Sequence, residues 1–268
     1  MITSTANQQV KLLVQLNKKR KLRDERGVFL VEGPKMFREA PRERLEKVYF
    51  SESFYEKHKE ALTRRIQAEK PDYEILDDHV FKTVSDTQTP QGVLCIVRQQ
   101  ESSLDALLKA EKPLLLLLEN LQDPGNLGTI LRTAEGAGVT GVILSKGCVD
   151  LYNPKTIRST MGSVYRVPTL YTEDLCQTVE ELKQHGIRSY AAHLKGVNFY
   201  DQENYQGGTA FLIGNEGNGL TEELTEKADT LIRIPMEGQL ESLNAGVASA
   251  LLMYEAYRQR RLTLTEPL

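Results

Sequence analysis

IPMEGQLESLNAGVA, residues 234–248, lies near the C-terminal end of the 268-residue chain, and AFLIGNEGNGL, residues 210–220, precedes it. Each segment begins as a short apolar run that is typical of a buried strand. Each then enters a loop that is too polar and too rich in glycine to be core. The second segment continues into an apolar helical pattern that reaches Arg260. Two strand ends, two loops and one helix start together predict a small-molecule site.

Strand and helix patterns alternate from Pro113 onward. Leu114–Leu118 predicts a buried strand, a helix is expected from about Asn126 to Ala137, and Asn153-Pro154 is a typical helix start. Further strands are expected at 141–144, 167–170, 187–192, 209–213 and 230–234, and further helices at 174–185 and 221–227. This alternation predicts an α/β fold with a mainly parallel sheet that is covered on both faces.

A smaller α/β unit is expected before this region. Its strand patterns lie near 27–31, 47–50, 73–76 and 92–97, with helices at 35–40 and 58–68 and an amphipathic helix within 5–23. The polar segment at 99–112 is predicted to be a linker. We therefore expect a basic helical extension at 1–26, a small domain at 27–98, the linker at 99–112 and a larger domain at 113–268.

Composition indicates an ordinary globular protein, with 40% hydrophobic and 26% charged residues. No apolar run approaches the roughly 20 residues of a membrane helix, and residues 1–26 contain no signal-peptide core. The three cysteines form neither a disulfide framework nor a zinc pattern, which favours reduced thiols in the cytoplasm.

Charge is distributed unevenly. The net charge of −3 divides into +5 for residues 1–26, which hold seven Lys or Arg against Asp24 and Glu25, and −8 for the rest. This asymmetry indicates either a basic arm that contacts phosphates or a solvated helix face, and charge alone does not separate the two.

The loop Gly214–Gly219 holds three glycines in six residues, which allow positive φ and a close approach of backbone to a ligand. Its pattern is neither the dinucleotide fingerprint nor a Walker loop, so a nucleotide-dependent metabolic enzyme is poorly supported. Taken alone, the loop could equally be a tight turn with a helix cap.

Three segments resemble the motifs of the SpoU (TrmH-like) branch of the SPOUT RNA 2′-O-ribose methyltransferases. The first is Asn126–Ala134, the second Ile213–Leu220, and the third Ile234–Met236 followed by Ser242–Asn244. They occur in the order of the family. One departure is visible, because many members have Val-Ser where this chain has Ala245-Gly246, which puts a serine contact at position 246 in doubt.

The resemblance implies a C-terminal SPOUT domain with a parallel sheet and a trefoil knot. Residues 28–33 and 89–93 are similar to an N-terminal substrate-binding domain, which is ribosomal-protein L30e-like in fold. The implied enzyme is a cytoplasmic homodimer that uses S-adenosylmethionine, needs no metal, and methylates a ribose 2′-hydroxyl. Its expected substrate is 23S ribosomal RNA, with transfer RNA as the alternative. A noncatalytic RNA-binding protein of the same fold is the alternative from another class.

The resemblance also assigns site residues. It implies cofactor binding by Gly214, Ile234, Met236 and Leu243. It implies a catalytic set of Arg132, Asn126, Glu216, Ser242 and Asn244, with the arginine of one subunit reaching the cofactor of the other. Val247, Leu251, Leu252 and Tyr254 are candidates for core or interface.

Arg132 is unsuited to act as a general base, because a guanidinium has a pKa above about 12. We expect it to hold an RNA phosphate and orient the ribose, so that the proton passes to that phosphate, to water or to Glu216. The plain alternatives are a helix N-cap for Asn126 and an ion pair with Glu135 for Arg132. If both belong to one helix, Asn126 and Arg132 are separated by about 600° and lie on different faces.

Other catalytic chemistries have little support in the sequence. The histidines make no metal pattern, and they are His58, His79, His185 and His193. Ser242 lacks the nucleophile elbow of a serine hydrolase.

Overall fold

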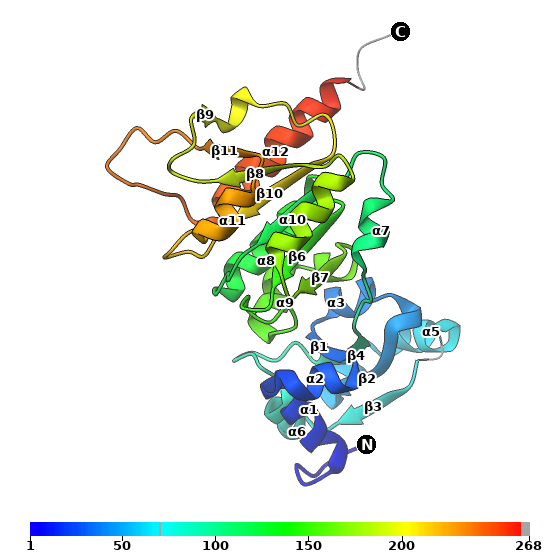
Figure 1. Ribbon diagram of the computed structural model, residues 1–268. Coiled ribbons are helices and arrows are strands. Elements are labelled where there is room, and N and C mark those ends of the chain that lie inside the picture. The colour runs from blue at the N-terminus through cyan, green and yellow to red at the C-terminus, as the bar shows by residue number, and fades with distance from the viewer. Residues whose placement is uncertain (70, 264–268) are drawn as a thin grey trace. The chain divides into compact units, whose positions relative to one another are not determined.

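The computed structural model describes residues 1–69 and 71–263 of the chain, and these form two compact units (Figure 1). The first unit combines Met1–Gln100 with Asp150–Tyr165, and the second combines Glu101–Val149 with the chain from Arg166 onward.

The second unit is built on a seven-stranded sheet in which every pairing is parallel. The strand order is β7-β6-β5-β10-β8-β11-β9. The strands are β5 (Leu114–Leu118), β6 (Gly141–Ser145), β7 (Thr169–Thr172), β8 (Arg188–Ala192), β9 (Asn198–Phe199), β10 (Thr209–Ile213) and β11 (Thr230–Arg233). Central β5 and β10 are buried along their whole length, as expected for parallel strands with both faces covered. The predicted parallel α/β sheet is confirmed.

Helices cover both faces of this sheet. Alternate residues of β5, Leu115 and Leu117, face a core shared with α7 (Leu104–Leu108), α10 (Leu175–Gln184) and α11 (Glu222–Lys227). On the other face, α8 (Pro124–Gly136) packs against α12 (Ala245–Thr263), which also contacts β10. The short 3-10 helix η3 spans Tyr200–Gln202.

This topology brings four loops to one edge of the sheet. β5 pairs with β10, and β10 and β11 both pair with β8, so the loops after β5, β8, β10 and β11 leave from neighbouring strand ends. The Gly-rich segment at 214–220 follows β10, and the segment at 234–244 follows β11. Ligands of open α/β sheets bind at such carboxyl edges, so the fold places both loops where a site is expected.

The first unit is a mixed four-stranded sheet in the order β1-β4-β2-β3. Its strands are β1 (Val28–Glu32), β2 (Leu45–Ser51), β3 (Tyr73–Leu76) and β4 (Val93–Arg98). One face packs against α1 (Gln8–Lys18) and α6 (Asp78–Val84). On the opposite face, Phe50 of β2 contacts Phe37 of α3 (Pro34–Glu39) and Phe54 of α4 (Glu52–Lys57). The period-two alternation of β1, β2 and β4 thus fills two separate cores.

The segment Asp150–Tyr165 belongs to the first unit, although the sequence places it inside the expected domain at 113–268. It contains α9 (Pro154–Thr160) and the 3-10 helix η2 (Ser163–Tyr165). The rings of Phe29 and Tyr152 stack with centroids 4.5 Å apart, and Tyr165 Oη donates to the Met36 carbonyl at 3.1 Å. Aromatic packing of this kind cannot be read from local periodicity. The functional division of the chain stays a prediction.

The N-terminal extension is helical, as expected, and the expected linker contains a short helix of its own. Lys19 is extended and divides residues 8–26 into α1 and α2 (Arg20–Arg26). Three residues of α1 (Val10, Leu13 and Leu16) are buried in the core of the first unit. Within the expected linker, Leu107 of α7 is buried.

Several element boundaries differ from expectation. The helix expected at 58–68 is preceded by a second one, so that α4 is followed by α5 (Lys59–Glu69). α8 begins two residues earlier than expected, and β7 lies two residues later. In the described part of the chain, no helix is long and apolar enough to span a bilayer. No group of three or more His, Cys, Asp or Glu side chains is placed to hold a metal ion among those residues.

Candidate active site

A cavity of about 300 Å³ opens at the carboxyl edge of the larger sheet. All four predicted cofactor positions line it, and these are Gly214, Ile234, Met236 and Leu243. Two predicted catalytic residues, Glu216 and Ser242, line it as well. Two loops that are well separated in sequence therefore form one pocket, because β10 and β11 flank β8.

Gly214 must be glycine because the backbone of its own loop leaves no room for a side chain. A Cβ at this position would lie 2.1 Å from the Gly219 carbonyl carbon and 2.2 Å from the Leu220 nitrogen. The approach is this close because Asn215 and Gly219 exchange two backbone hydrogen bonds of 2.9 Å, with Gly219 at φ +69°. The glycines thus fold the loop back on itself and leave its inner side against the cavity.

The cavity combines an apolar lining with exposed backbone. Ile213, Leu220 and Ile232 are buried beneath it, and Ile234 and Leu243 are half-buried in its wall. The loops supply peptide donors and acceptors at the same place. This combination suits a ligand that has a flat apolar ring system with polar edges.

Glu216 ties the loop after β10 to the loop after β5. Its carboxylate accepts hydrogen bonds from the backbone N–H groups of Gln122 and Asp123 and from Asn126 Nδ2, each at 3.0 Å. Burial raises the pKa of this carboxyl, but the hydrogen bonds from Asn126, Gln122 and Asp123 outweigh it and the pKa is lowered. Glu216 is therefore held as an anion whose oxygens are already engaged.

Asn126 does not cap its helix, contrary to the plain alternative weighed above. Asp123 is the N-cap of α8, because Asp123 Oδ1 accepts from the Asn126 N–H at 2.8 Å and Pro124 occupies the first turn. Asn126 therefore lies in the first turn with its side chain free to bridge. Its Nδ2 donates to Glu216, and its Oδ1 accepts from Asn244 Nδ2 at 2.9 Å.

Asn244 fixes the start of α12. Its side-chain oxygen accepts hydrogen bonds from the N–H groups of Gly246 at 2.9 Å and Val247 at 3.3 Å, as the side chain of an N-cap residue does. A Cβ at Gly246 would lie 3.2 Å from that oxygen. Asn126, Glu216 and Asn244 thus form one continuous chain of hydrogen bonds across three loops.

The sequence did not single out Asn120, although it supports the same cluster. It has φ +51°, an uncommon conformation for a residue other than glycine. Its carbonyl accepts from Asn215 Nδ2 at 2.8 Å, and its N–H donates to Ser145 Oγ at 2.9 Å. His193 and Leu194, after β8, line the cavity and were also missed. An asparagine two residues after a buried strand was the only signal available for Asn120.

Arg132 stands apart from these residues. It is exposed on α8 and does not line the cavity. Glu135 pairs with Arg166 at 2.5 Å, so the ion pair considered for Arg132 and Glu135 is not formed. Within residues 1–69 and 71–263, no ion pair includes Arg132. The structure brings together Asn126, Glu216 and Asn244 and leaves the arginine on an open surface.

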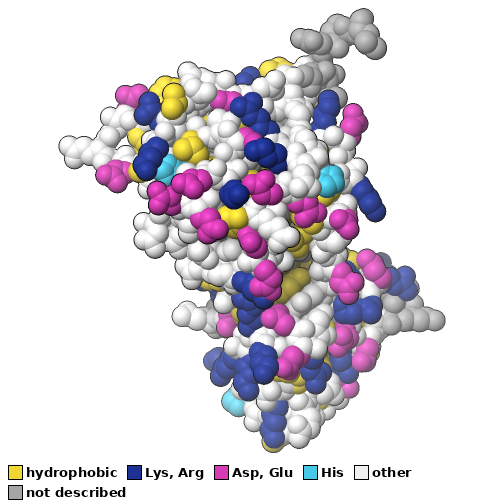
Figure 2. All heavy atoms as spheres, viewed as in Figure 1, with side chains coloured by type: hydrophobic (Ala, Val, Ile, Leu, Met, Phe, Trp, Pro, Cys, Tyr) yellow, Lys and Arg dark blue, Asp and Glu magenta, His cyan; other side chains and the backbone are white. Residues whose placement is uncertain are grey.

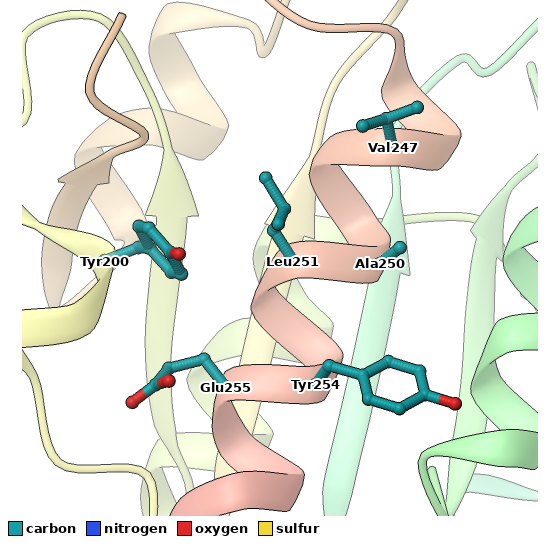
Figure 3. Close-up of a pocket in the computed structure, with 6 residues that line it drawn as sticks. All are labelled: Tyr200, Val247, Ala250, Leu251, Tyr254 and Glu255. Atoms are coloured by element: carbon teal, nitrogen blue, oxygen red, sulfur yellow. The ribbon is translucent and has the colours of Figure 1, made fainter.

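The exposed face of α12 forms a second, shallow hollow of about 400 Å³ (Figure 3). Val247 and Tyr254 are each 49% exposed, whereas Leu252 is fully buried and belongs to the core. Leu251 and Ala250 lie between them on the helix, and Tyr200 faces the helix from η3 (Figure 3). Large apolar side chains that share a face are typical of an interaction surface.

Comparison with known proteins gives two adjacent family matches. Residues 113–254 match the SpoU rRNA Methylase family, and residues 7–95 match the MRM3-like substrate binding domain.

Two individual relatives match nearly the whole chain, and a third matches part of it. The 23S rRNA (guanosine(2553)-2′-O)-methyltransferase RlmP of Bacillus subtilis is 34% identical over 94% of this chain and 97% of its own. The AdoMet-bound rRNA methyltransferase from Sinorhizobium meliloti is 30% identical with a TM-score of 0.83, over 96% of this chain and 97% of that one. The A. aeolicus TrmH/SpoU tRNA modifying enzyme is 28% identical with a TM-score of 0.51, over 59% of this chain and 81% of its own.

Proposed function

The chain belongs to the SpoU rRNA methylase family, and from this premise we propose that it methylates a ribose 2′-hydroxyl of 23S ribosomal RNA. It is an RNA methyltransferase that uses S-adenosylmethionine. The observation that carries the proposal is the cavity at the carboxyl edge of the sheet, where Gly214, Ile234, Met236 and Leu243 meet beside Glu216 and Ser242.

Ribosomal RNA is favoured over transfer RNA by the extent of the similarities. The two rRNA methyltransferases named above match 94% and 96% of this chain, including its N-terminal unit. The tRNA-modifying enzyme matches 59%. The N-terminal unit is also the part that resembles a substrate-binding domain. Transfer RNA is the second candidate substrate.

The residues at the cavity fit S-adenosylmethionine. The volume of about 300 Å³ lies at the lower end of the range for small-molecule pockets, roughly 300–1,000 Å³. Ile234, Met236 and Leu243 would hold the adenine, and the backbone at Gly214 would approach the ligand closely. When bound, the cofactor supplies a methyl group that is already strongly electrophilic. The protein's task is therefore to align the acceptor hydroxyl and exclude water.

Arg132 is assigned to the acceptor side of the reaction. Its permanent charge and planar donors suit a bidentate contact with an RNA phosphate, which would orient the ribose. Its exposure on α8 and its separation from the cavity support a role toward a second copy of the chain. In this arrangement Arg132 of one subunit completes the site formed by the loops of the other.

Glu216 is assigned a positioning role rather than that of proton acceptor. Three N–H donors already engage its carboxylate, and its lowered pKa makes it a weaker base. The proton of the 2′-hydroxyl then passes to the RNA phosphate or to water. Asn126 and Asn244 are assigned to hold Glu216 and the start of α12 in fixed positions relative to each other. Ser242 lines the cavity and is assigned to contact the substrate or the cofactor.

The exposed face of α12 is assigned to a homodimer interface. Val247 and Tyr254 present apolar surface there, beside the half-buried Leu251. Burial of such side chains contributes about 1.5–3 kcal/mol each. The trefoil knot implied by the family resemblance is part of the same proposal, since the loops at 214–220 and 234–244 would form it.

The reaction is placed in the cytoplasm, because ribosomal RNA is the proposed substrate. Within the described residues Cys95, Cys148 and Cys176 form no disulfide, which is compatible with a reducing compartment. A noncatalytic RNA-binding protein of the same fold would have no need to keep Asn126, Glu216 and Asn244 in one hydrogen-bonded chain beside a cavity.

The direct test is methyl transfer from labelled S-adenosylmethionine to ribosomal RNA from a strain that lacks this protein. We expect incorporation at one nucleotide, resistant to alkaline cleavage at its 3′ side. Replacing the target ribose by deoxyribose should abolish transfer, since the acceptor oxygen is then missing. Transfer to transfer RNA alone, or transfer that survives the deoxy substitution, would overturn the assigned substrate or the assigned acceptor.

A further inference from the structure

The charged residues of the first N-terminal helix, α1, are all basic. No Asp or Glu precedes Asp24 in the chain, and α1 contains none at all. Figure 2 shows Lys and Arg side chains gathered over the part of the first unit where Figure 1 draws α1 and α2. The sequence left open whether this charge belongs to a phosphate-binding element or to a solvated helix.

The two faces of α1 differ completely. Val10, Leu13 and Leu16 are buried in the core of the first unit. Gln8, Lys11, Gln15 and Lys18 are on the outer side, at the spacing of three and four residues that places them along one side of a helix. Lys19 follows, exposed, at the junction with α2. We call Lys11, Lys18 and Lys19 the basic stripe.

The basic residues of α1 and α2 differ in whether an acidic side chain already pairs with them. Arg23 is buried, where it contacts Asp150 and the Leu16 carbonyl, and so serves the fold. Arg20 pairs with Asp24 at 3.4 Å and Lys21 with Glu25 at 3.8 Å. In the part of the chain that the structure describes, no ion pair or side-chain hydrogen bond engages Lys11, Lys18 or Lys19.

The helices α4 and α5 show what a solvated charged surface looks like in the same unit. There acidic and basic residues alternate along the sequence, and Lys59 pairs with Glu56 at 3.3 Å. The basic stripe lacks such partners within the described residues. Its backbone is also fixed, because Asn17 Nδ2 donates to the Val84 carbonyl at 2.7 Å and anchors the end of α1 to α6. A row of ammonium and amide groups on a fixed backbone can follow a phosphate backbone at a reduced ordering cost.

We propose that the basic stripe binds the phosphate backbone of structured RNA, and so helps to hold the substrate through residues other than those that line the cavity. This inference rests on the proposed RNA substrate. Contacts of this kind read no sequence, but they add affinity and orient the RNA.

The test compares two triple variants of the full chain with equal loss of charge. K11Q/K18Q/K19Q removes the stripe and keeps helix-forming residues. K57Q/K59Q/K109Q removes three exposed lysines elsewhere. Binding to purified 23S ribosomal RNA is measured over a range of salt concentrations. We expect the stripe variant to bind on the order of ten- to a hundredfold more weakly. Its salt slope should be smaller by about 0.7–0.9 for each phosphate that the protein no longer neutralises.

Equal behaviour of the two triple variants would overturn the proposal, and so would an unchanged salt slope in the stripe variant. Binding of the wild type to vesicles that contain anionic lipid, with no preference for RNA, would overturn it as well. Methyl transfer at saturating RNA should be retained by the stripe variant, with the loss appearing in KM. If wild-type protein binds the RNA with the expected difference but transfers no methyl group, the proposed function fails and this inference stands.

Discussion

The loops beside the cavity and the exposed faces of α8 and α12 belong to one unit but differ in completeness. In the loops, Glu216, Asn126 and Asn244 are connected through hydrogen bonds of 2.9–3.0 Å, and Gly214 leaves no room for a side chain. On the helices, Arg132 is exposed, and Val247 and Tyr254 are each about half exposed.

This difference divides the proposed reaction into two halves. The residues of the cofactor half already hydrogen-bond to one another within one chain, so this half is complete in the single chain. The acceptor half consists of groups that have the right chemistry but point to solvent in the single chain. A second copy would bring the acceptor half of one chain to the cofactor half of the other, and mutations in the two halves should therefore have different effects on turnover and on cofactor binding.

The largest expected effect is on the acceptor half. Arg132→Ala should slow methyl transfer by about 10²–10³-fold, because it removes a fixed charge beside the target ribose. Cofactor affinity, measured by calorimetry, should change little, since Arg132 does not line the cavity. Arg132→Lys should recover only part of the rate, because an ammonium cannot make the bidentate contact.

Arg166→Ala is the matched control for Arg132. Arg166 is an exposed arginine of the same unit that already pairs with Glu135. Near-normal turnover in Arg132→Ala, or an equal loss in Arg166→Ala, would remove Arg132 from the mechanism.

The cofactor half should fail through binding. Gly214→Ala places a Cβ 2.1 Å from the Gly219 carbonyl carbon, so the loop must move away from the cavity. We expect S-adenosylmethionine to bind at least about tenfold more weakly, which corresponds to about 1.4 kcal/mol. Gly217→Ala in the same loop should leave affinity unchanged, because its Cβ would meet only Asn215 Oδ1 at 3.5 Å. Unchanged cofactor affinity in Gly214→Ala would place the ligand elsewhere.

Assembly should respond to the face of α12. Val247→Glu places a charge on a half-exposed apolar position of that face, and we expect a shift from dimer to monomer in light scattering. Methyl transfer should fall with it, while cofactor binding persists. Val197→Glu makes the same exchange at a position that is 88% exposed in the same unit, and it should leave the dimer intact. A wild type that is monomeric and fully active would contradict the shared site.

The smallest expected effect concerns pH. Burial raises the pKa of Glu216, but its hydrogen bonds lower it further, so the folded value lies below the ordinary 4.5. The charged carboxylate therefore stabilises the fold above that pH, and this contribution is lost as pH falls through the lower folded value. Melting temperature should fall less steeply below about pH 4.5 in Glu216→Gln than in the wild type. Glu226→Gln, at an exposed carboxylate of α11, should keep the wild-type slope.

Much of the larger unit was predictable because its signals are local. The apolar runs at Leu114–Leu118 and Thr209–Ile213 coincide with β5 and β10, and parallel order follows from alternation with helices. That the loops at 214–220 and 234–244 meet at one cavity was predictable, because both follow strand ends and strand ends meet at one edge of a sheet. The cofactor roles of the residues in these loops came from the family resemblance and stay a prediction.

The missed features depend on contacts between distant segments. A helix cap was the plain alternative for Asn126, yet Asp123 takes that place and Asn126 bridges Glu216 and Asn244 instead. Asn120 supports the site through φ +51° and its carbonyl, which no period in the sequence encodes. The segment at 150–165 packs with the first unit through aromatic side chains, although its neighbours in sequence belong to the second.

The central claim is that one chain supplies the cofactor half and another the acceptor half of each site. It is tested most directly by mixing the two variants Arg132→Ala and Gly214→Ala after dissociation and reassociation, at a cofactor concentration that fills the wild-type loop but leaves the Gly214→Ala loop largely empty. Each mixed dimer should then contain one site with an intact cofactor loop and an intact arginine, so random pairing should restore about a quarter of wild-type methyl transfer. If the mixture, with exchange of chains verified, is no more active than the separate variants, the two halves come from the same chain and the account is wrong.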